Sequence, residues 1–222
     1  MIITAQIWAA YRKRLAKVNE KAELLMQQYV DKHGLEDVDK VMQMAYQIAG
    51  KYGEAAAAAA CDMYDAIAMA QGADVLAAVP AMVPTMQEVK DVIGYALDTA
   101  PVTVPASTGK LVKKTATRTM RKNAARDNAE MALIPSGDGC AFCKMLASRG
   151  WESSRSSKSF EAHLHPHCQC EYVVRFDRSL DVEGYNPDAL LQEFKDTGEH
   201  SWKDRLNAMR RQQDTDEDED EE

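Results

Sequence analysis

Four of the five cysteines lie in two close pairs within a stretch of 31 residues. Cys140 and Cys143 have Cys-x-x-Cys spacing, and Cys168 and Cys170 belong to the segment HPHCQC at residues 165–170. A turn that carries Cys-x-x-Cys directs both sulfur atoms to one side, which supplies two ligands for a tetrahedral zinc ion. The paired spacing and the odd total favour a local metal site over the disulfide framework of a secreted fold.

The second pair of ligands can be chosen in two ways. His165 and Cys168 have His-x-x-Cys spacing, which suits a second turn, whereas Cys168 and Cys170 would face the same side of an extended strand. At most one or two of the three nearby histidines can be ligands, and we expect His163 and His167 to be exposed or to support the ligands. The sequence therefore predicts one structural zinc ion per chain, bound by four residues of the set Cys140, Cys143, His165, Cys168 and Cys170.

The same residues also admit two enzymatic interpretations. An HNH-type nuclease can combine zinc-binding turns with histidines, but its second turn is normally Cys-x-x-Cys, and no Asn or Asp partner for a catalytic histidine stands out. A Cys/His hydrolase would use one cysteine as nucleophile and one histidine as base, which leaves the paired spacing unexplained. A catalytic zinc ion would need a carboxylate base, for which Glu161 and Glu171 are the nearest candidates. We expect a structural protein rather than an enzyme.

The elements that precede this cluster are predicted to be helices. Apolar residues at spacings of three and four from Ile7 to Tyr29 predict a long helix that ends at Gly34. A second helix is expected from Asp37, through the alanine run at 55–60, to Gly72, with Cys61 as a small core residue. The segment TMQE at 85–88 is a capping box that opens a third helix, which should stop before Pro101.

Around the cysteines the pattern changes. PVTVPAST at 101–108 predicts an extended linker, and CEYVVRF at 170–176 predicts a strand. A small module of this kind has little core, so a metal ion can supply the missing folding energy. We therefore expect a mainly α protein with a helical domain at 1–130, a zinc-stabilised α+β module with short strands at 131–180, a helical or irregular segment at 181–213 and a disordered acidic tail at 214–222.

Charge is distributed unevenly along the chain. Eight of the 35 acidic residues lie in the last nine positions, so 27 acids balance the 27 bases in the rest of the chain. The segment from Lys110 to Arg126 holds seven Lys or Arg and no acid. It is either a solvated helix face or a contact for phosphates or an acidic protein surface, and without aromatic residues a nucleic acid would be contacted only through its backbone, without sequence preference. No segment is apolar enough to predict a signal peptide, a membrane span or a membrane partner.

With these motifs together, the chain resembles the MuF-like minor head proteins, or head morphogenesis proteins, of tailed bacteriophages. The resemblance is carried by YGEAAAAAACDMYDAI at 52–67, CAFCKMLASRG at 140–150 and Phe160 with HPHCQC at 165–170, which occur in that order, and it extends over most of the chain. It implies a virion protein made in the host bacterial cytoplasm and carried inside the head near the portal, with the portal or major capsid protein as partner and a role in head assembly or DNA delivery. By motif position, the same five Cys and His residues match the family's set.

Overall fold

The computed structural model of the protein describes residues 5–135, 139–155, 165, 170–179 and 181–220. Their secondary structure is mainly helical, with a small sheet. In chain order the elements are α1 Ala5–His33, α2 Val38–Ala70, α3 Met86–Thr99, the short 3-10 helix η1 Pro101–Thr103, α4 Val104–Asp127, β1 Glu130–Ile134, α5 Ala141–Ala147, β2 Glu152–Ser153, β3 Glu171–Arg175, α6 Pro187–Asp196 and α7 Trp202–Asp220.

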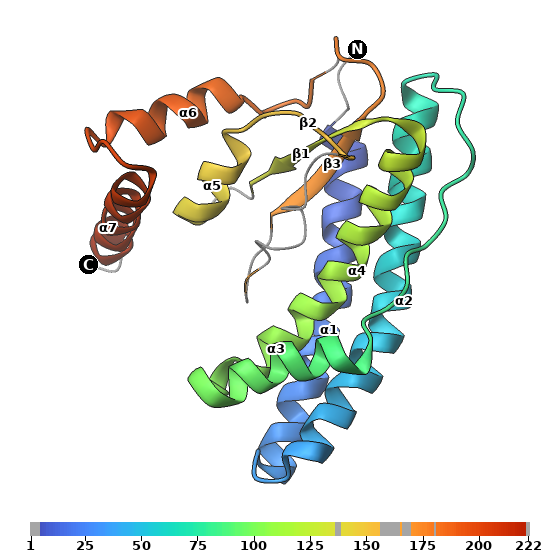
Figure 1. Ribbon diagram of the computed structural model, residues 1–222, viewed down its shortest axis with the longest axis vertical. Helices are drawn as coiled ribbons and strands as arrows, with labels where there is room; N and C mark the ends of the chain where they lie inside the picture. Colours follow the sequence, from blue (N-terminus) through green and yellow to red (C-terminus); the bar gives the residue numbers. More distant parts are fainter. Residues whose placement is uncertain (1–4, 136–138, 156–164, 166–169, 180, 221–222) are drawn as a thin grey trace.

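The long helices α1, α2 and α4 lie side by side, and α3 crosses them near one end (Figure 1). The three predicted helix boundaries are confirmed. Gly34 has a left-handed φ of +72° directly after α1, and the Asp37 side chain accepts a hydrogen bond from the Lys40 backbone N–H at the start of α2. Thr85 and Glu88 form the predicted capping box of α3. The alanines of α2 are mostly buried, so their small side chains let the neighbouring helices approach closely.

Helix α4 is the central element of this bundle, since it contacts α1, α2, α3, β1 and β3. The prediction of an extended linker at 101–108 is wrong, because α4 already begins at Val104. Pro101 starts η1 and Pro105 lies in the first turn of α4, where proline is well tolerated because the first backbone N–H groups of a helix have no partner within it. The helix buries Thr108, Thr115 and Thr119, whose hydroxyls donate to carbonyl oxygens one turn earlier.

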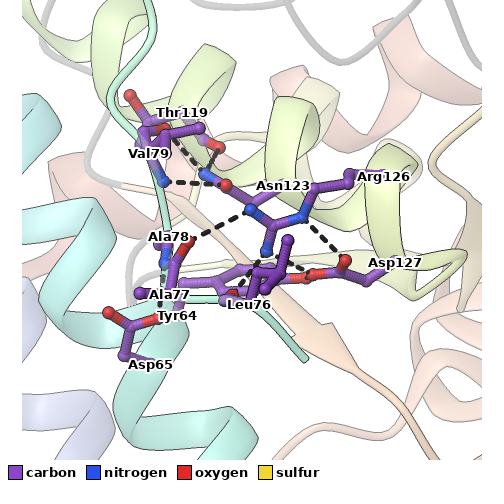
Figure 2. A network of polar contacts seen from close by, with 10 residues as sticks. All are labelled: Tyr64, Asp65, Leu76, Ala77, Ala78, Val79, Thr119, Asn123, Arg126 and Asp127. Atoms are coloured by element: carbon purple, nitrogen blue, oxygen red, sulfur yellow. Dashed lines mark hydrogen bonds and ion pairs between the residues drawn. The ribbon is translucent and has the colours of Figure 1, made fainter. Parts of the chain in front are cut away.

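An extended segment at residues 73–84, here called the strap, connects α2 to α3. Polar side chains of α2 and α4 hold it in place (Figure 2). The Asn123 amide donates to the Val79 carbonyl and accepts from the Val79 backbone N–H, both at 2.9 Å. The Arg126 guanidinium donates to the carbonyl oxygens of Leu76 and Ala77. These bonds satisfy backbone groups that a segment without regular structure would otherwise leave to water.

The sheet has the strand order β2-β1-β3, and β1 is antiparallel to both neighbours. β1 pairs with β3 from Glu130 opposite Arg175 to Ile134 opposite Glu171, which brings the segment after the second cysteine pair back beside α4. The predicted strand at 170–176 is therefore confirmed. One buried cluster extends from Trp8 in α1 to Met209 in α7, so the bundle and the sheet share a core.

The C-terminal helices α6 and α7 lie on the side of α5 that faces away from the bundle (Figure 1). The acidic run at 214–222, predicted to be disordered, continues α7 as far as Asp220, and residues 221 and 222 lie outside the described residues. Extending an existing helix needs no new nucleus, which is the physical reason a charged segment can follow α7. Within the described part of the chain, no helix is long and apolar enough to cross a membrane.

Candidate metal centre

Cys140 and Cys143 are positioned by the start of α5. Cys140 is the N-cap residue, its carbonyl accepts a hydrogen bond from the Lys144 N–H at 3.0 Å, and Cys143 lies in the first turn. This places residues three apart on one side of the turn. The Cys143 side chain is buried and Cys140 is partly buried, so both sulfur atoms sit at the edge of the core rather than in open solvent.

His165 completes a group of three ligands. Its Nε2 atom lies 3.2 Å from the Cys140 Sγ and 3.5 Å from the Cys143 Sγ, and the three ligand atoms lie within 4.8 Å of one another. With zinc–sulfur and zinc–nitrogen bonds of about 2.3 Å and 2.05 Å, a tetrahedral site separates S and N ligands by about 3.6 Å. The observed spacing is close to this value, so one ion can reach all three atoms with little rearrangement.

The electrostatics of the group favour the metal-binding form of the sulfur. Hydrogen bonding from Cys143, and then from His165, holds the pKa of the Cys140 thiol well below its ordinary value although partial burial opposes this. The thiolate is the form of cysteine that binds a metal ion. Two sulfurs and an imidazole nitrogen are a donor set suited to zinc.

Of the other two predicted ligands, the structure describes Cys170 but not Cys168. Cys170 is buried immediately before β3 and, among the described residues, does not belong to the group of three; it packs in the shared core. Cys168, together with His163, His167 and Glu161, lies outside the described residues. The geometry thus brings together Cys140, Cys143 and His165, three of the five predicted ligands, and the choice of the fourth ligand stays a prediction.

Glu171, a candidate carboxylate base, is instead the partner of a buried lysine. Its Oε1 lies 2.9 Å from the Lys113 Nζ, and both side chains are almost fully buried. Burial, and then the Glu171 carboxylate, raises the pKa of Tyr11 in α1 well above its ordinary value. Glu171 links β3 to α4, and the sequence could not show this because its partner is 58 positions away.

Residues from α6 and α7 hold the cysteine turn in place. The Gln213 side chain accepts from the Ala141 N–H at 2.8 Å and donates to the Gly139 carbonyl at 3.0 Å, so it grips the backbone on both sides of Cys140. Lys144 forms an ion pair with Glu193 of α6 at 2.9 Å. Hydrogen bonds to the groups beside a metal ligand fix the orientation of that ligand. Gln213 was missed from the sequence, where a single glutamine in a charged helix carries no signal.

Several positive charges in the basic segment of α4 are paired with acidic side chains, which the sequence alone does not show. Lys114 and Arg118 both pair with Glu88 of α3, whose pKa falls to about 2 mainly through the Arg118 hydrogen bond. Arg126 pairs with the adjacent Asp127. Together with the Lys113–Glu171 pair, these contacts use much of the positive charge to hold the bundle together.

Comparison with known proteins gives one family. A family model described as VG15 protein matches residues 2–197, which include the bundle, the cysteine pairs, the sheet and α6. No curated protein and no solved structure matches the chain.

Proposed function

We propose that this chain, which belongs to the VG15 protein family and is therefore a phage protein, is a minor head protein of a tailed phage. In this proposal it resides inside the head near the portal and acts in head assembly or DNA delivery, as the resemblance to MuF-like proteins implies. The family match over residues 2–197 carries the phage assignment, and the order of the alanine-rich helix and the two cysteine pairs supports the head role.

We further propose that one structural zinc ion binds to Cys140, Cys143, His165 and Cys168. The observation that carries this is the position of the His165 nitrogen between two sulfurs, at 3.2 and 3.5 Å. Cys168 is the fourth ligand because its His-x-x-Cys spacing to His165 repeats the spacing of the first pair. When bound, zinc would cross-link α5 to the segment before β3, which gives the short elements of the module a fixed relative position.

One observation favours a second candidate, a Cys/His hydrolase. A cysteine with a lowered pKa beside a histidine nitrogen is also the arrangement of a nucleophile and its base. It gives no role to Cys143, whose sulfur lies 3.5 Å from the same nitrogen. Hydrolysis of casein or of p-nitrophenyl esters that Cys140→Ser abolishes would support the hydrolase, and a metal-loaded protein without such activity would support the zinc site.

The head role is tested in the phage itself. We expect mass spectrometry of gradient-purified virions to find the protein after DNase and external protease treatment, in far fewer copies than the major capsid protein. A nonsense mutation in its gene should give heads that are misassembled or that adsorb without delivering DNA. Absence of the protein from virions, combined with normal heads and normal infectivity in the mutant, would refute the proposal.

The zinc site is tested by metal analysis of the purified protein. We expect about one zinc ion per chain, since four ligands saturate a tetrahedral ion. His165→Ala should lower metal retention strongly, whereas His163→Ala and His167→Ala, matched controls in the same segment, should not. Equal retention in all three variants would point to the four-cysteine alternative with Cys170.

A further inference from the structure

The sulfur atoms of Cys140 and Cys143 lie close enough to react with each other. They are at most 4.8 Å apart, and both contact the same nitrogen of His165. A disulfide has an S–S distance of about 2.05 Å, so the two atoms must approach by about 3 Å or less, which rotation of the two side chains supplies. Cys140 is the N-cap residue and lies outside the regular turns of α5, so it can adjust without disturbing the helix.

The two thiols differ in exposure in the way that a dithiol redox couple requires. Cys140 is partly buried, so a small oxidant can reach it, whereas Cys143 is buried. An oxidised cysteine is captured when a second thiol stands beside it, because the second sulfur attacks the first before further oxidation. Cys143 has this position, since its sulfur lies 3.5 Å from the nitrogen that Cys140 also contacts.

The two other described cysteines differ from this pair. Cys61 lies in α2, and burial raises the pKa of its thiol, which disfavours the reactive thiolate. Cys170 is buried in the shared core and, among the described residues, is not part of the ligand group. In the folded protein, oxidation should therefore begin at Cys140.

We infer that Cys140 and Cys143 are a reversible redox couple, in which hydrogen peroxide joins the two sulfurs in a disulfide and so removes two ligands of the proposed metal site. A disulfide sulfur is no longer the thiolate that binds a metal ion. The release of metal rests on the proposed zinc site, whereas the disulfide itself requires only the two cysteines. Such a couple makes metal binding in this module sensitive to the oxidation state of the surroundings.

The chemistry consists of two displacements. The Cys140 thiolate attacks one oxygen of hydrogen peroxide, so an S–O bond forms, the O–O bond breaks and hydroxide leaves. The Cys143 thiolate then attacks the Cys140 sulfur, so the S–S bond forms, the S–O bond breaks and a second hydroxide leaves. In total the two thiolates lose two electrons, and the peroxide takes up these electrons with two protons from solvent to give two molecules of water. A dithiol such as dithiothreitol reduces the bond again by thiol–disulfide exchange.

Oxidation would change the cross-link of the module without dislodging the cysteine turn. The hydrogen bonds of Gln213 go to the backbone at Ala141 and Gly139, so they do not depend on the sulfurs. The metal ion would join Cys140 to His165 across 25 positions, whereas the disulfide joins residues three apart. A cross-link that closes so short a loop restricts the unfolded chain less than one that closes a long loop. The oxidised module should therefore keep its turn but lose the connection between α5 and the segment before β3.

The test treats the full-length, zinc-containing protein with hydrogen peroxide and follows metal release with a chelator that reports zinc by colour. Trypsin then separates the cysteines into three peptides, which are 52–90 with Cys61, 127–144 with Cys140 and Cys143, and 159–175 with Cys168 and Cys170. We expect peptide 127–144 to lose the mass of two hydrogen atoms and to resist alkylation, in step with about one zinc ion released per disulfide. Dithiothreitol should restore both the free thiols and metal binding.

The matched control is Cys61→Ser, which keeps both sulfurs of the couple and should form the same disulfide at a rate within about twofold of wild type. Cys143→Ser should instead leave Cys140 as a sulfenic acid, which the trapping reagent dimedone labels. The wild-type peptide map decides the case even if Cys143→Ser unfolds. Protein oxidised in guanidinium chloride supplies the disulfide pattern of an unfolded chain for comparison.

The possible outcomes separate this couple from the zinc site. A disulfide within peptide 127–144 of a protein that purifies without zinc would refute the zinc site and still support the couple. A bond that joins 127–144 to 159–175, a pattern equal to that of the unfolded chain, or thiols that stay free or oxidise irreversibly in a protein that does bind zinc, would overturn the couple and leave the zinc site standing.

Discussion

The helical bundle and the cysteine-containing module achieve order by different means. In the bundle, helices of 29, 33 and 24 residues bury long apolar and alanine-rich faces against one another. In the module, the helix that begins directly after Cys140 has seven residues, and the strands have five, two and five. Elements this short bury little apolar surface individually, so specific polar contacts must define their positions.

Those contacts come from outside the module. Glu171 at the start of β3 pairs with Lys113 of the bundle, Gln213 of α7 grips the turn around Cys140, and Ser154 donates to the Ala129 carbonyl. The module is therefore built between the bundle and the C-terminal helices. Within it, the ligand group connects the start of α5 to His165 in the segment before β3. The bundle, by contrast, is held mainly by contacts among its own long helices, although Cys143 and Cys170 belong to the same buried cluster. This difference predicts that the two regions respond differently to the same kinds of change.

Cys143→Ser is expected to produce the largest difference in stability between the module and the bundle. Zinc binding in small metal-dependent domains contributes about 10–16 kcal/mol of apparent free energy, so loss of one ligand should release the metal and unfold the module. The bundle should keep its helices because α1, α2 and α4 pack mainly against one another. Zinc content, helical circular dichroism and the sites of limited proteolysis would measure this.

The control for that variant is Cys61→Ser, which changes a half-buried cysteine of α2 outside the ligand group. It should keep the metal and the wild-type proteolysis pattern. If Cys143→Ser also kept a protease-resistant module, or if it unfolded the bundle together with the module, the proposed division of stability between the regions would be wrong.

The second largest effect should come from the ion pair that joins the two regions. Lys113→Met leaves the Glu171 carboxylate buried without its cation, which typically costs about 3–5 kcal/mol. The double variant Lys113→Met/Glu171→Met removes both charges and should recover most of that loss, since replacing a buried pair by apolar groups is often nearly neutral. Chemical denaturation of both variants measures the difference. An equal free energy of unfolding in the two variants would contradict a role for the pair itself.

The bundle could be predicted from the sequence because each helix carries its own local signals. The apolar spacing from Ile7 to Tyr29, the cap at Asp37 and the capping box at Thr85 all act within a few residues. The error at 101–108 has the same origin: proline was taken as a sign of extended chain although it also starts helices. The burial of α4 was not visible because its buried face includes threonines and a lysine, which hydropathy patterns count as polar.

The candidate site could be predicted only in part. Local spacing identified Cys140, Cys143 and His165, which the structure brings together. It could not show that Cys170 is buried in the shared core, because an alternating pattern in a strand does not reveal which side faces the core. The partners Gln213 and Lys113 lie far from the cysteines in the chain and have residue types that are common on surfaces, so only the fold identifies them.

A smaller effect, confined to the bundle, is expected from Glu88→Gln. The carboxylate accepts from Arg118, Lys114 and the Thr85 backbone, and these bonds lower its pKa from 4.5 to about 2. Because the pKa is lower in the folded state, its stabilising contribution is present above about pH 4.5 and is lost as the pH falls towards 2. We expect the variant to be about 1–2 kcal/mol less stable at pH 7, with metal content unchanged. The difference from wild type should shrink between pH 4.5 and 2.5 in denaturation experiments; a constant difference would contradict the assignment.

The last prediction, which concerns metal binding rather than folding, tests whether α7 supports the cysteine turn or merely lies beside it. Gln213→Ala removes both hydrogen bonds to the backbone around Cys140, and loss of such supporting contacts typically weakens metal binding by about 10- to 100-fold. Truncation after Gln213, which deletes the acidic run at 214–222 but keeps the glutamine, is the matched control and should leave metal retention unchanged. Both are measured by the rate of zinc transfer to a chelator that reports binding by colour. Faster release in the alanine variant alone would show that the helix positions the ligands. Equal release rates in the alanine variant and wild type would show that the turn holds its geometry without α7, and faster release in the truncated protein would assign the support to the acidic run instead.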